Sequence, residues 1–296
     1  MKEIYLEYKS KKYKTCVDKY KILLAEDYNT ILEFCAQLNK ALQKNAESEY
    51  GDENYKTRLL INEVAFDHRR SLIVEITPFT KLDDFLKTTS KSISLKFVES
   101  AIEGVEFDDM FLTFQHMYDL ISEEIIAERT KINNDEVSLN FILTPFTSKL
   151  FTKLVEPRIL KNDLYANDAD LSSVEKIKLY IDIVNKTASQ VVDFDYYVLF
   201  HCYEFTKEIK ILLDSLNSNV ICLVFPYQIK VAIQKENICL LDKTSIDLMF
   251  DDDIYNKLIL EYADTNDILE YKKRIDNVLI NNDNGNNIYN QIIRFI

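Results

Sequence analysis

The sequence predicts an α/β protein with a mainly parallel sheet, and the carboxyl-terminal half supplies the clearest reason. Apolar runs at 195–200 and 220–225 flank an amphipathic segment at 205–216. A strand, a helix and a second strand within about thirty residues make the βαβ unit that parallel strands require. The chain has 3 glycines, each isolated, so no glycine-rich loop can bring backbone amides close to a phosphate. We therefore expect a P-loop-like head that lacks a phosphate-binding loop.

The amino-terminal elements follow from alternating polarity and then from helical spacing. Residues 4–8 and 13–17 flank a hydrophilic segment at 9–12, which predicts a two-stranded ribbon with a basic turn. The apolar run 21–25 predicts the first buried strand. Asp27 precedes apolar residues at helical spacing, so it is expected to cap a helix that extends to about residue 45.

The next segment combines a loop with short strands. Residues 46–55 are expected to form the loop, and residues 58–62 a second strand. The short apolar run 71–76 fits either a strand or a helix, because periodicity alone does not separate the two at this length.

The middle of the chain changes to a helical pattern. Apolar residues recur at helical spacing from 79 to 129, and 108–129 keeps one apolar stripe, which predicts a long helix projecting from the sheet. Ser172 or Ser173 begins another long helix to about residue 192, which returns the chain to the sheet.

These elements define the predicted organisation of the chain. Residues 1–78 and 193–243 form the α/β head, and residues 79–192 form a helical arm inserted between its two parts. Residues 244–296 are a C-terminal helical extension rich in acidic residues. Its helices and its apolar docking end are expected at 252–262, 266–280 and 288–296.

The composition indicates a globular protein with a full core, because 47% of the 296 residues are hydrophobic. No apolar run approaches the ~20 residues that span a bilayer, and no signal-peptide pattern follows Met1. A cytoplasmic protein without membrane contact is therefore expected. The 5 cysteines are widely spaced and lie mostly in apolar runs, which favours buried free thiols over disulfides or a zinc site.

The charge is strongly acidic but unevenly distributed. The formal net charge is −13, which by itself argues against binding to a phosphate backbone. Residues 1–21 nevertheless carry 7 lysines against 3 acids, whereas residues 242–296 carry 11 acids against 6 bases. This asymmetry fits a protein with one basic face, although from composition alone a solvated lysine-rich ribbon explains it better.

Motifs for catalysis are missing from the sequence: there is no nucleophile elbow, no His-Glu-x-x-His and no P-loop. His201 and Glu204 follow an apolar strand at the end where α/β sites usually lie, although a histidine there is more often structural. Asp193, Asp195 and the run 251–253 could bind a hard cation, but helix caps and solvated faces explain them better.

The order of these elements resembles that of the ring-forming spacer-acquisition proteins of type II-A CRISPR systems, here called the Csn-two family. The resemblance covers roughly residues 1–243. Residues 22–27 resemble the family's first strand with its acidic end, and residues 60–67 resemble its second strand, which closes on Phe-Asp. Three further runs, 197–200, 221–225 and 238–242, resemble the family's final strands. The additional carboxyl-terminal residues resemble the family's longer forms.

The resemblance implies a protein that is not a nuclease. It implies a homotetrameric ring that takes double-stranded DNA ends through a lysine-lined hole, and calcium ions that hold the arms of the subunits. It also implies the CRISPR integrase complex and effector nuclease as partners. A ring can concentrate positive charge inside while its exterior is acidic, so the net charge of −13 does not exclude DNA.

Two sets of residues are candidates for these contacts. The basic residues expected to contact DNA phosphates are Lys9, Lys11, Lys12, Lys14, Arg69 and Arg70. The carboxylates expected to bind calcium lie towards the far end of the arm and are Glu123, Glu124, Glu128, Asp135 and Glu136. Lys131, Asn133 and Asn134 interrupt the acidic stretch, so a solvated helix face explains these carboxylates equally well.

Two other classes of function stay open. The first is a metal-dependent nuclease or phosphatase on a degenerate nucleotide-binding fold, with Mg²⁺ held at strand ends by Glu26, Asp27, Glu63 and Asp67. The second is a protein-binding scaffold whose helical arm and acidic extension dock partners.

Overall fold

The structure is a computed structural model. The chain folds into two compact units. The head unit comprises Met1–Lys81 and Leu171–Ile296, and the inserted unit comprises Leu82–Asp170. The described residues are 1–9, 11–42, 57–89, 92–102, 108–129, 150, 152, 154–242, 244–250, 252–254, 256 and 268–280.

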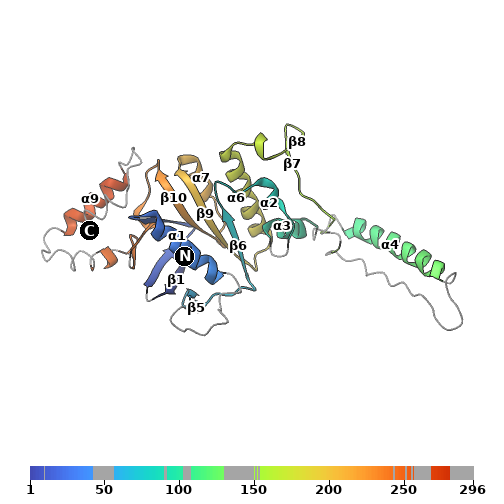
Figure 1. Ribbon diagram of the computed structural model, residues 1–296, viewed down its shortest axis with the longest axis horizontal. Coiled ribbons are helices and arrows are strands. Elements are labelled where there is room, and N and C mark those ends of the chain that lie inside the picture. The colour runs from blue at the N-terminus through green and yellow to red at the C-terminus, as the bar shows by residue number, and fades with distance from the viewer. Residues whose placement is uncertain are drawn as a thin grey trace. The chain divides into compact units, whose positions relative to one another are not determined.

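A six-stranded, mostly parallel sheet forms the centre of the head unit (Figure 1). The strand order is β12-β11-β3-β10-β9-β6, and every neighbouring pair is parallel except β11 with β12. The bounds are β3 Tyr20–Ala25, β6 Ser71–Ile76, β9 Asp195–Phe205, β10 Val220–Ile229, β11 Ile238–Leu241 and β12 Ser245–Asp247. The α/β fold class predicted from the sequence is confirmed, and the undecided run 71–76 is a strand.

The predicted ribbon is also present and belongs to a second sheet. This four-stranded antiparallel sheet has the order β2-β1-β4-β5, with β1 Lys2–Tyr8, β2 Lys11–Val17, β4 Arg58–Ile61 and β5 Val64–Ala65. The strand expected at 58–62 therefore exists, but it pairs with β1 and not with the parallel sheet. Leu59 faces the core and Leu60 faces outwards, because the two faces of a strand alternate.

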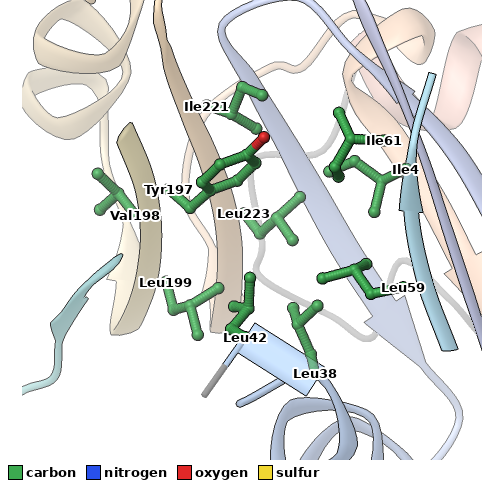
Figure 2. A pocket seen from close by; sticks show the side chains of 10 residues that line it. All are labelled: Ile4, Leu38, Leu42, Leu59, Ile61, Tyr197, Val198, Leu199, Ile221 and Leu223. Carbon is green, nitrogen blue, oxygen red and sulfur yellow. The ribbon is translucent and has the colours of Figure 1, made fainter. Parts of the chain in front are cut away.

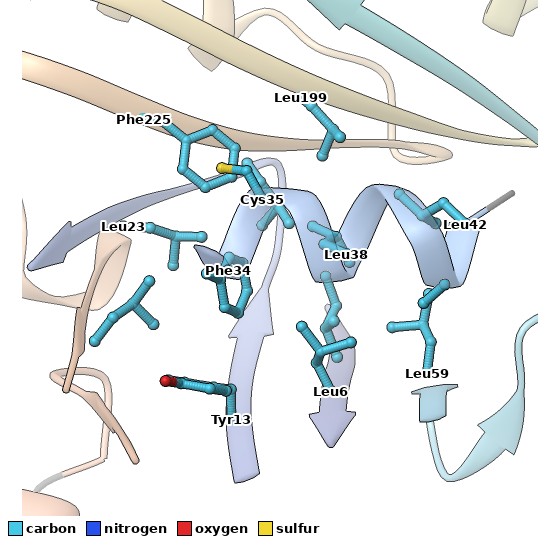
Figure 3. Packing of buried hydrophobic residues seen from close by; sticks show 14 of the residues in the cluster. Leu6, Tyr13, Leu23, Phe34, Cys35, Leu38, Leu42, Leu59, Leu199 and Phe225 are labelled. Carbon is cyan, nitrogen blue, oxygen red and sulfur yellow. The ribbon is translucent and has the colours of Figure 1, made fainter. Parts of the chain in front are cut away.

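Helix α1, Tyr28–Leu42, lies between the two sheets of the head unit. Its predicted cap is confirmed, because the Asp27 carboxylate accepts hydrogen bonds from the backbone N and the Oγ1 of Thr30. Figure 3 shows its buried side chains, such as Phe34 and Leu38, between Leu6 of the ribbon and Phe225 of the parallel sheet. One core therefore joins both sheets.

Helices α6, Ser173–Gln190, and α7, Lys207–Asp214, contact each other in the head unit. Ser172 caps α6 in a capping box with Glu175. Helix α6 has a buried stripe that includes Tyr180 and Val184, and it belongs to the head unit. The sequence had instead placed it in the helical arm, predicted at 79–192. The Tyr196 hydroxyl of β9 donates to Val191 O just after α6.

The inserted unit contains the predicted helical segment and a hairpin that was not predicted. The helices are α2 Leu82–Leu86, α3 Ile93–Ile102 and α4 Asp108–Arg129, and the hairpin strands are β7 Ile159–Lys161 and β8 Leu164–Ala166. A 3-10 turn, Asp168–Asp170, follows the hairpin. Asn162 and Asp163 have positive φ angles of 54° and 63°, which is the backbone that a two-residue hairpin turn needs.

The carboxyl-terminal segment begins inside the head. A short 3-10 turn, Lys235–Asn237, leads into β11, and β12 completes the sheet. Strand β12 lies within 244–296, the range that the sequence predicted as the helical extension. Helix α9, Ile268–Ile280, corresponds to the helix predicted at 266–280, and Ile275 and Leu279 are buried. The predicted apolar end 288–296 lies outside the described residues, as does most of the predicted helix 252–262.

All 5 cysteines are buried and free, as the sequence predicted. Over the part of the chain that the structure describes, no helix is both long enough and apolar enough to cross a bilayer.

Candidate functional site

The junction between β3 and α1 is the place where nucleotide-binding α/β folds hold phosphate. Here only Glu26 and Asp27 separate Ala25 of β3 from Tyr28 of α1. The distance from Thr30 N to Asp27 Oδ1 is 2.9 Å, and the hydrogen bonds from Thr30 hold the pKa of Asp27 below its usual value. A carboxylate thus already accepts a backbone N–H at the start of the helix, and its negative charge disfavours a phosphate at that place.

The four carboxylates of the proposed magnesium site do not come together. Glu26 and Asp27 follow β3 at the carboxyl edge of the parallel sheet. Asp67 precedes β6, accepts a 2.8 Å hydrogen bond from Arg69 N and lies at the opposite edge, because β3 and β6 run in the same direction. Glu63 lies in the β4–β5 turn of the other sheet, with a φ angle of 65°. These residues therefore form no common metal site.

The four lysines of the ribbon each have a carboxylate partner. Lys11 Nζ lies 2.8 Å from Glu33 of α1, and Lys9 Nζ lies 3.8 Å from the same carboxylate. On the outer face of the ribbon, Lys12 pairs with Glu7 at 3.8 Å and Lys14 with Glu3 at 2.9 Å. Lys9, Lys12 and Lys14 are more than half exposed, whereas Lys11 is 34% exposed. The ribbon is basic but locally compensated.

Arg69 and Arg70 lie at a different place on the head. Their turn precedes β6, and the neighbouring His68 Nδ1 lies 2.9 Å from Leu42 O at the end of α1. Lys9 and Lys11 of the ribbon instead contact α1 at Glu33, nine residues before Leu42, which corresponds to about 13 Å along a helix. Both arginines are exposed. The six predicted bases thus form two basic groups at different levels of α1.

The predicted calcium ligands are only partly described. Glu123 and Glu124 are exposed on α4 of the inserted unit. The side chain of Glu128, together with Asp135 and Glu136, lies outside the described residues. Within the described ranges no group of three or more His, Cys, Asp or Glu side chains is placed to hold a metal ion.

Helix α4 exposes an unusual amount of apolar surface within the inserted unit. The exposed large side chains are Met110, Leu112, Phe114, Met117, Leu120 and Ile121. The half-buried positions Phe111, Tyr118 and Ile125 follow another line along the helix. The stripe that the sequence predicted is therefore only partly covered, and apolar area of this kind normally marks an interface.

His201 and Glu204 lie within β9, near its carboxyl end, whereas the sequence placed them just past the end of the strand. The His201 ring stacks on Phe225, with ring centroids 4.8 Å apart, and its Nε2 lies 3.7 Å from Glu75 Oε1. Burial lowers the pKa of His201, so the ring is held neutral near pH 7. Glu204 contacts Lys230 at 4.0 Å.

A group of tyrosines beside His201 was missed by the sequence reasoning. Tyr203 of β9 stacks on Tyr227 of β10, with centroids 5.2 Å apart, and Tyr28 of α1 contacts Tyr227 edge-on at 6.3 Å. A usable signal was present: both strands keep large side chains at alternate positions beyond the apolar run, where solvent exposure begins.

One small cavity lies in the core between α1 and the two sheets (Figure 2). Apart from Tyr197, its lining is aliphatic, with Leu38 and Leu42 from α1, Ile4 and Leu59 from the ribbon sheet, and Leu199 and Leu223 from the parallel sheet. At about 10 Å³, the cavity could hold at most one water, and it offers few polar partners even for that. It is a packing defect and not a ligand site.

The fold and this site define a mostly parallel α/β protein without a phosphate-binding junction. No family model matches the sequence, and no curated protein matches it. The chain is similar to the crystal structure of Stu0660 of Streptococcus thermophilus, with a TM-score of 0.66 and 12% sequence identity. The similarity covers 94% of this chain and 85% of that chain, so the two proteins share the fold.

Proposed function

We propose that the protein is a non-catalytic ring protein of the Csn-two type, which binds double-stranded DNA ends and assists spacer acquisition in type II-A CRISPR systems. Two sequence anchors support the proposal. Residues 22–27 cover most of β3 and its acidic end, residues 221–225 lie on β10, and residues 238–242 cover β11 and the residue after it. The third anchor, 60–67, lies in the ribbon sheet, so it carries less weight. The shared fold with Stu0660 over nearly the whole chain is compatible with the proposal.

The β3–α1 junction is the observation that carries the proposal. A P-loop-like sheet whose phosphate position holds an N-capping carboxylate has lost nucleotide chemistry at that place. The separation of Glu26 and Asp27 from Asp67 counts against the metal-dependent alternative that the sequence left open. What supports a binding role is that the remaining distinctive features are surfaces: a basic ribbon, a basic turn and an apolar helix.

DNA binding through phosphates is compatible with the ion pairs of the ribbon. An exposed lysine–carboxylate pair contributes only about 0–1 kcal/mol, so a phosphate can replace the carboxylate at little cost. Release of counterions from the DNA then favours the complex. Lys12 and Lys14 are better placed for this exchange than Lys11, which is less exposed. Arg69 and Arg70 add a second basic group.

The exposed apolar side chains of α4 support self-assembly, and we propose a homotetrameric ring. A closed ring buries the same patch on every subunit and leaves none exposed. Calcium ions are proposed to neutralise the carboxylates Glu123, Glu124, Glu128, Asp135 and Glu136, and the integrase complex and effector nuclease are the proposed partners in the cytoplasm. Ligands of this type suit the six to eight oxygens that calcium takes.

A gel-retention experiment with linear and covalently closed DNA of the same sequence tests this proposal. The expected result is retention of the linear duplex, no retention of the closed circle and no cleavage of either with Mg²⁺ or Mn²⁺. Equal retention of both forms contradicts end binding, and cleavage contradicts a non-catalytic role.

A further inference from the structure

Three exposed tyrosines form a contiguous aromatic surface on the head unit. Tyr203 and Tyr227 lie nearly parallel, with 13° between their planes, and Tyr28 meets Tyr227 at 72°. Their exposed fractions are 60% for Tyr203, 62% for Tyr227 and 45% for Tyr28. Large rings that contact one another yet stay this exposed gain little from folding alone, which suggests that the surface serves a ligand.

The surface lies at the carboxyl edge of the parallel sheet. Val224 of β10 is paired with Ile22 of β3, so continuing that register places Tyr227 level with Ala25, where β3 ends. Leu241, the last residue of β11, is also paired with Ala25. Tyr203 lies level with Tyr227, because Pro226 is paired with Cys202. Ligands of open α/β sheets bind outside this edge.

The charged groups near the tyrosines include two exposed carboxylates, Glu26 and Glu75. Glu75 is 47% exposed, and its carboxylate lies 3.7 Å from the ring of His201, which burial holds neutral near pH 7. Glu26 is exposed two residues before Tyr28. Lys230, the nearby base on β10's end, is already paired with Glu204. Lys11, a base whose charge reaches Asp27 beside Tyr28, is likewise paired with Glu33. An anionic ligand such as a nucleotide would therefore compete with carboxylates for these two lysines.

We propose that the Tyr28–Tyr203–Tyr227 surface binds a cationic group, a guanidinium presented by a basic segment of a partner protein. The tyrosine faces carry the negative pole of the ring quadrupole, and a guanidinium stacks on such faces. Glu26 and Glu75 supply the complementary charge. The edge that holds phosphate in nucleotide-binding relatives of this fold class would here hold the opposite charge. This inference is independent of the proposed binding of DNA.

The test is fluorescence anisotropy of a labelled hexapeptide that alternates glycine and arginine, titrated with the full-length protein at moderate salt. The double variant Tyr203→Leu/Tyr227→Leu removes both rings and leaves the charge unchanged, so general attraction to an acidic protein is kept. We expect its affinity to fall by about fivefold to tenfold, as loss of cation–π contacts predicts. The ring-preserving variant Tyr203→Phe/Tyr227→Phe should bind within about twofold of the wild type.

Three controls make each outcome decisive. Tyr165→Leu removes an exposed tyrosine of the inserted unit and should leave affinity unchanged. Glu26→Gln/Glu75→Gln keeps the rings and should also weaken binding, which preserves the test if the leucine variant does not fold. A labelled oligothymidine replaces the peptide in a parallel titration.

The proposal is overturned if the leucine variant, when folded, and the glutamine variant bind the peptide like the wild type. It is equally overturned if the rings support binding of oligothymidine and not of the peptide, since that result identifies a platform for nucleobases. Retention of duplex DNA should be unchanged in all these variants, so failure of this inference is distinguishable from failure of the DNA-binding proposal.

Discussion

Lys21 and Asp247 form an ion pair that is almost wholly removed from solvent, with Nζ 2.6 Å from Oδ1. Lys21 also donates to Glu236 O, and the second carboxylate oxygen of Asp247 accepts hydrogen bonds from Thr15 Oγ1 and Cys16 N. The pair therefore links β3 and β12 of the parallel sheet to β2 of the ribbon sheet. It links the basic ribbon to the parallel sheet within the head unit.

Replacing Lys21 by methionine leaves the Asp247 charge buried without its partner. We expect the free energy of unfolding to fall by about 3–5 kcal/mol, measured by urea denaturation, because breaking a buried pair from one side is strongly destabilising. The double variant Lys21→Met/Asp247→Asn should recover part of the loss, since the uncompensated charge is gone. A Lys21→Met protein as stable as the wild type contradicts the assigned role of the pair.

Protonation of His201 should destabilise the head at mildly acidic pH. Burial lowers its pKa in the folded state below the unfolded value of 6.5, so between those two pKa values the unfolded chain binds more protons. Its contribution to stability is therefore complete above pH 6.5 and is lost as the pH falls through the folded pKa. Thermal melting from pH 7.5 to 5 should show a smaller loss in His201→Phe than in the wild type. Identical pH profiles would mean that His201 does not titrate as described.

The apolar surface of α4 should drive assembly. Met117, Leu120 and Ile121 are all more than half exposed, and they lie at i, i+3 and i+4 spacing on one side of the helix. Replacing Leu120 and Ile121 by glutamate should reduce the mass measured by light scattering from a tetramer towards a monomer, with little change in helix content. The matched variant Leu160→Glu/Leu164→Glu on the β7–β8 hairpin should remain a tetramer. A wild-type monomer at micromolar concentration excludes the ring.

The ribbon lysines should contribute to DNA retention through phosphate contacts. Changing Lys9, Lys11, Lys12 and Lys14 together to glutamate is expected to abolish retention and leave the oligomer intact. The control set, Lys40, Lys178, Lys207 and Lys273, changes the net charge equally at other exposed positions and should weaken retention much less. The salt dependence of the remaining binding should also become shallower. Unchanged retention in the ribbon variant removes the ribbon from the site.

A separate variant, Arg69→Ala/Arg70→Ala, distinguishes the two basic groups of the head. It should weaken retention by a smaller factor than the ribbon variant if both groups contact one duplex.

Calcium should stabilise the assembly by relieving repulsion among the carboxylates of the arm. Millimolar calcium is expected to raise the melting temperature through linkage, and magnesium should have less effect because it demands stricter geometry. Asp135→Ala/Glu136→Ala should reduce the shift. If the shift persists in that variant, or if calcium has no effect on melting or oligomer size, these carboxylates form a solvated helix face.

The sequence predicted those elements whose periodicity is local. Asp27 was identified as an N-cap and 108–129 as a helix because capping and helical spacing depend on neighbouring residues. The partner of the strand at 58–61 could not be predicted, because β4 pairs with β1, which lies more than fifty residues earlier in the sequence. Its pattern of residues is compatible with a place in either sheet. Helix α6 was assigned to the wrong unit for the same reason. Its apolar stripe predicts that one face of the helix is buried, but the stripe does not show which element buries that face.

The candidate site was harder to predict than the fold. The lysines of the ribbon were visible in the sequence, but their ion pairs with Glu3, Glu7 and Glu33 depend on strand register and on the placement of α1. The tyrosine surface unites residues about two hundred positions apart, so only the sheet register reveals it. The burial of Lys21 depends on Asp247, which lies more than two hundred residues later in the chain, so local sequence could not predict this ion pair.

The most direct test of the account is whether binding requires a free DNA end. A linear duplex with biotin at both ends is incubated with the protein before or after streptavidin is added, and complexes are separated on a native gel. A ring that threads DNA ends predicts no complex when streptavidin is added first, and a complex that resists competitor DNA when streptavidin is added second. Equal binding in both orders would show that the protein binds along the side of the duplex, which contradicts the ring model.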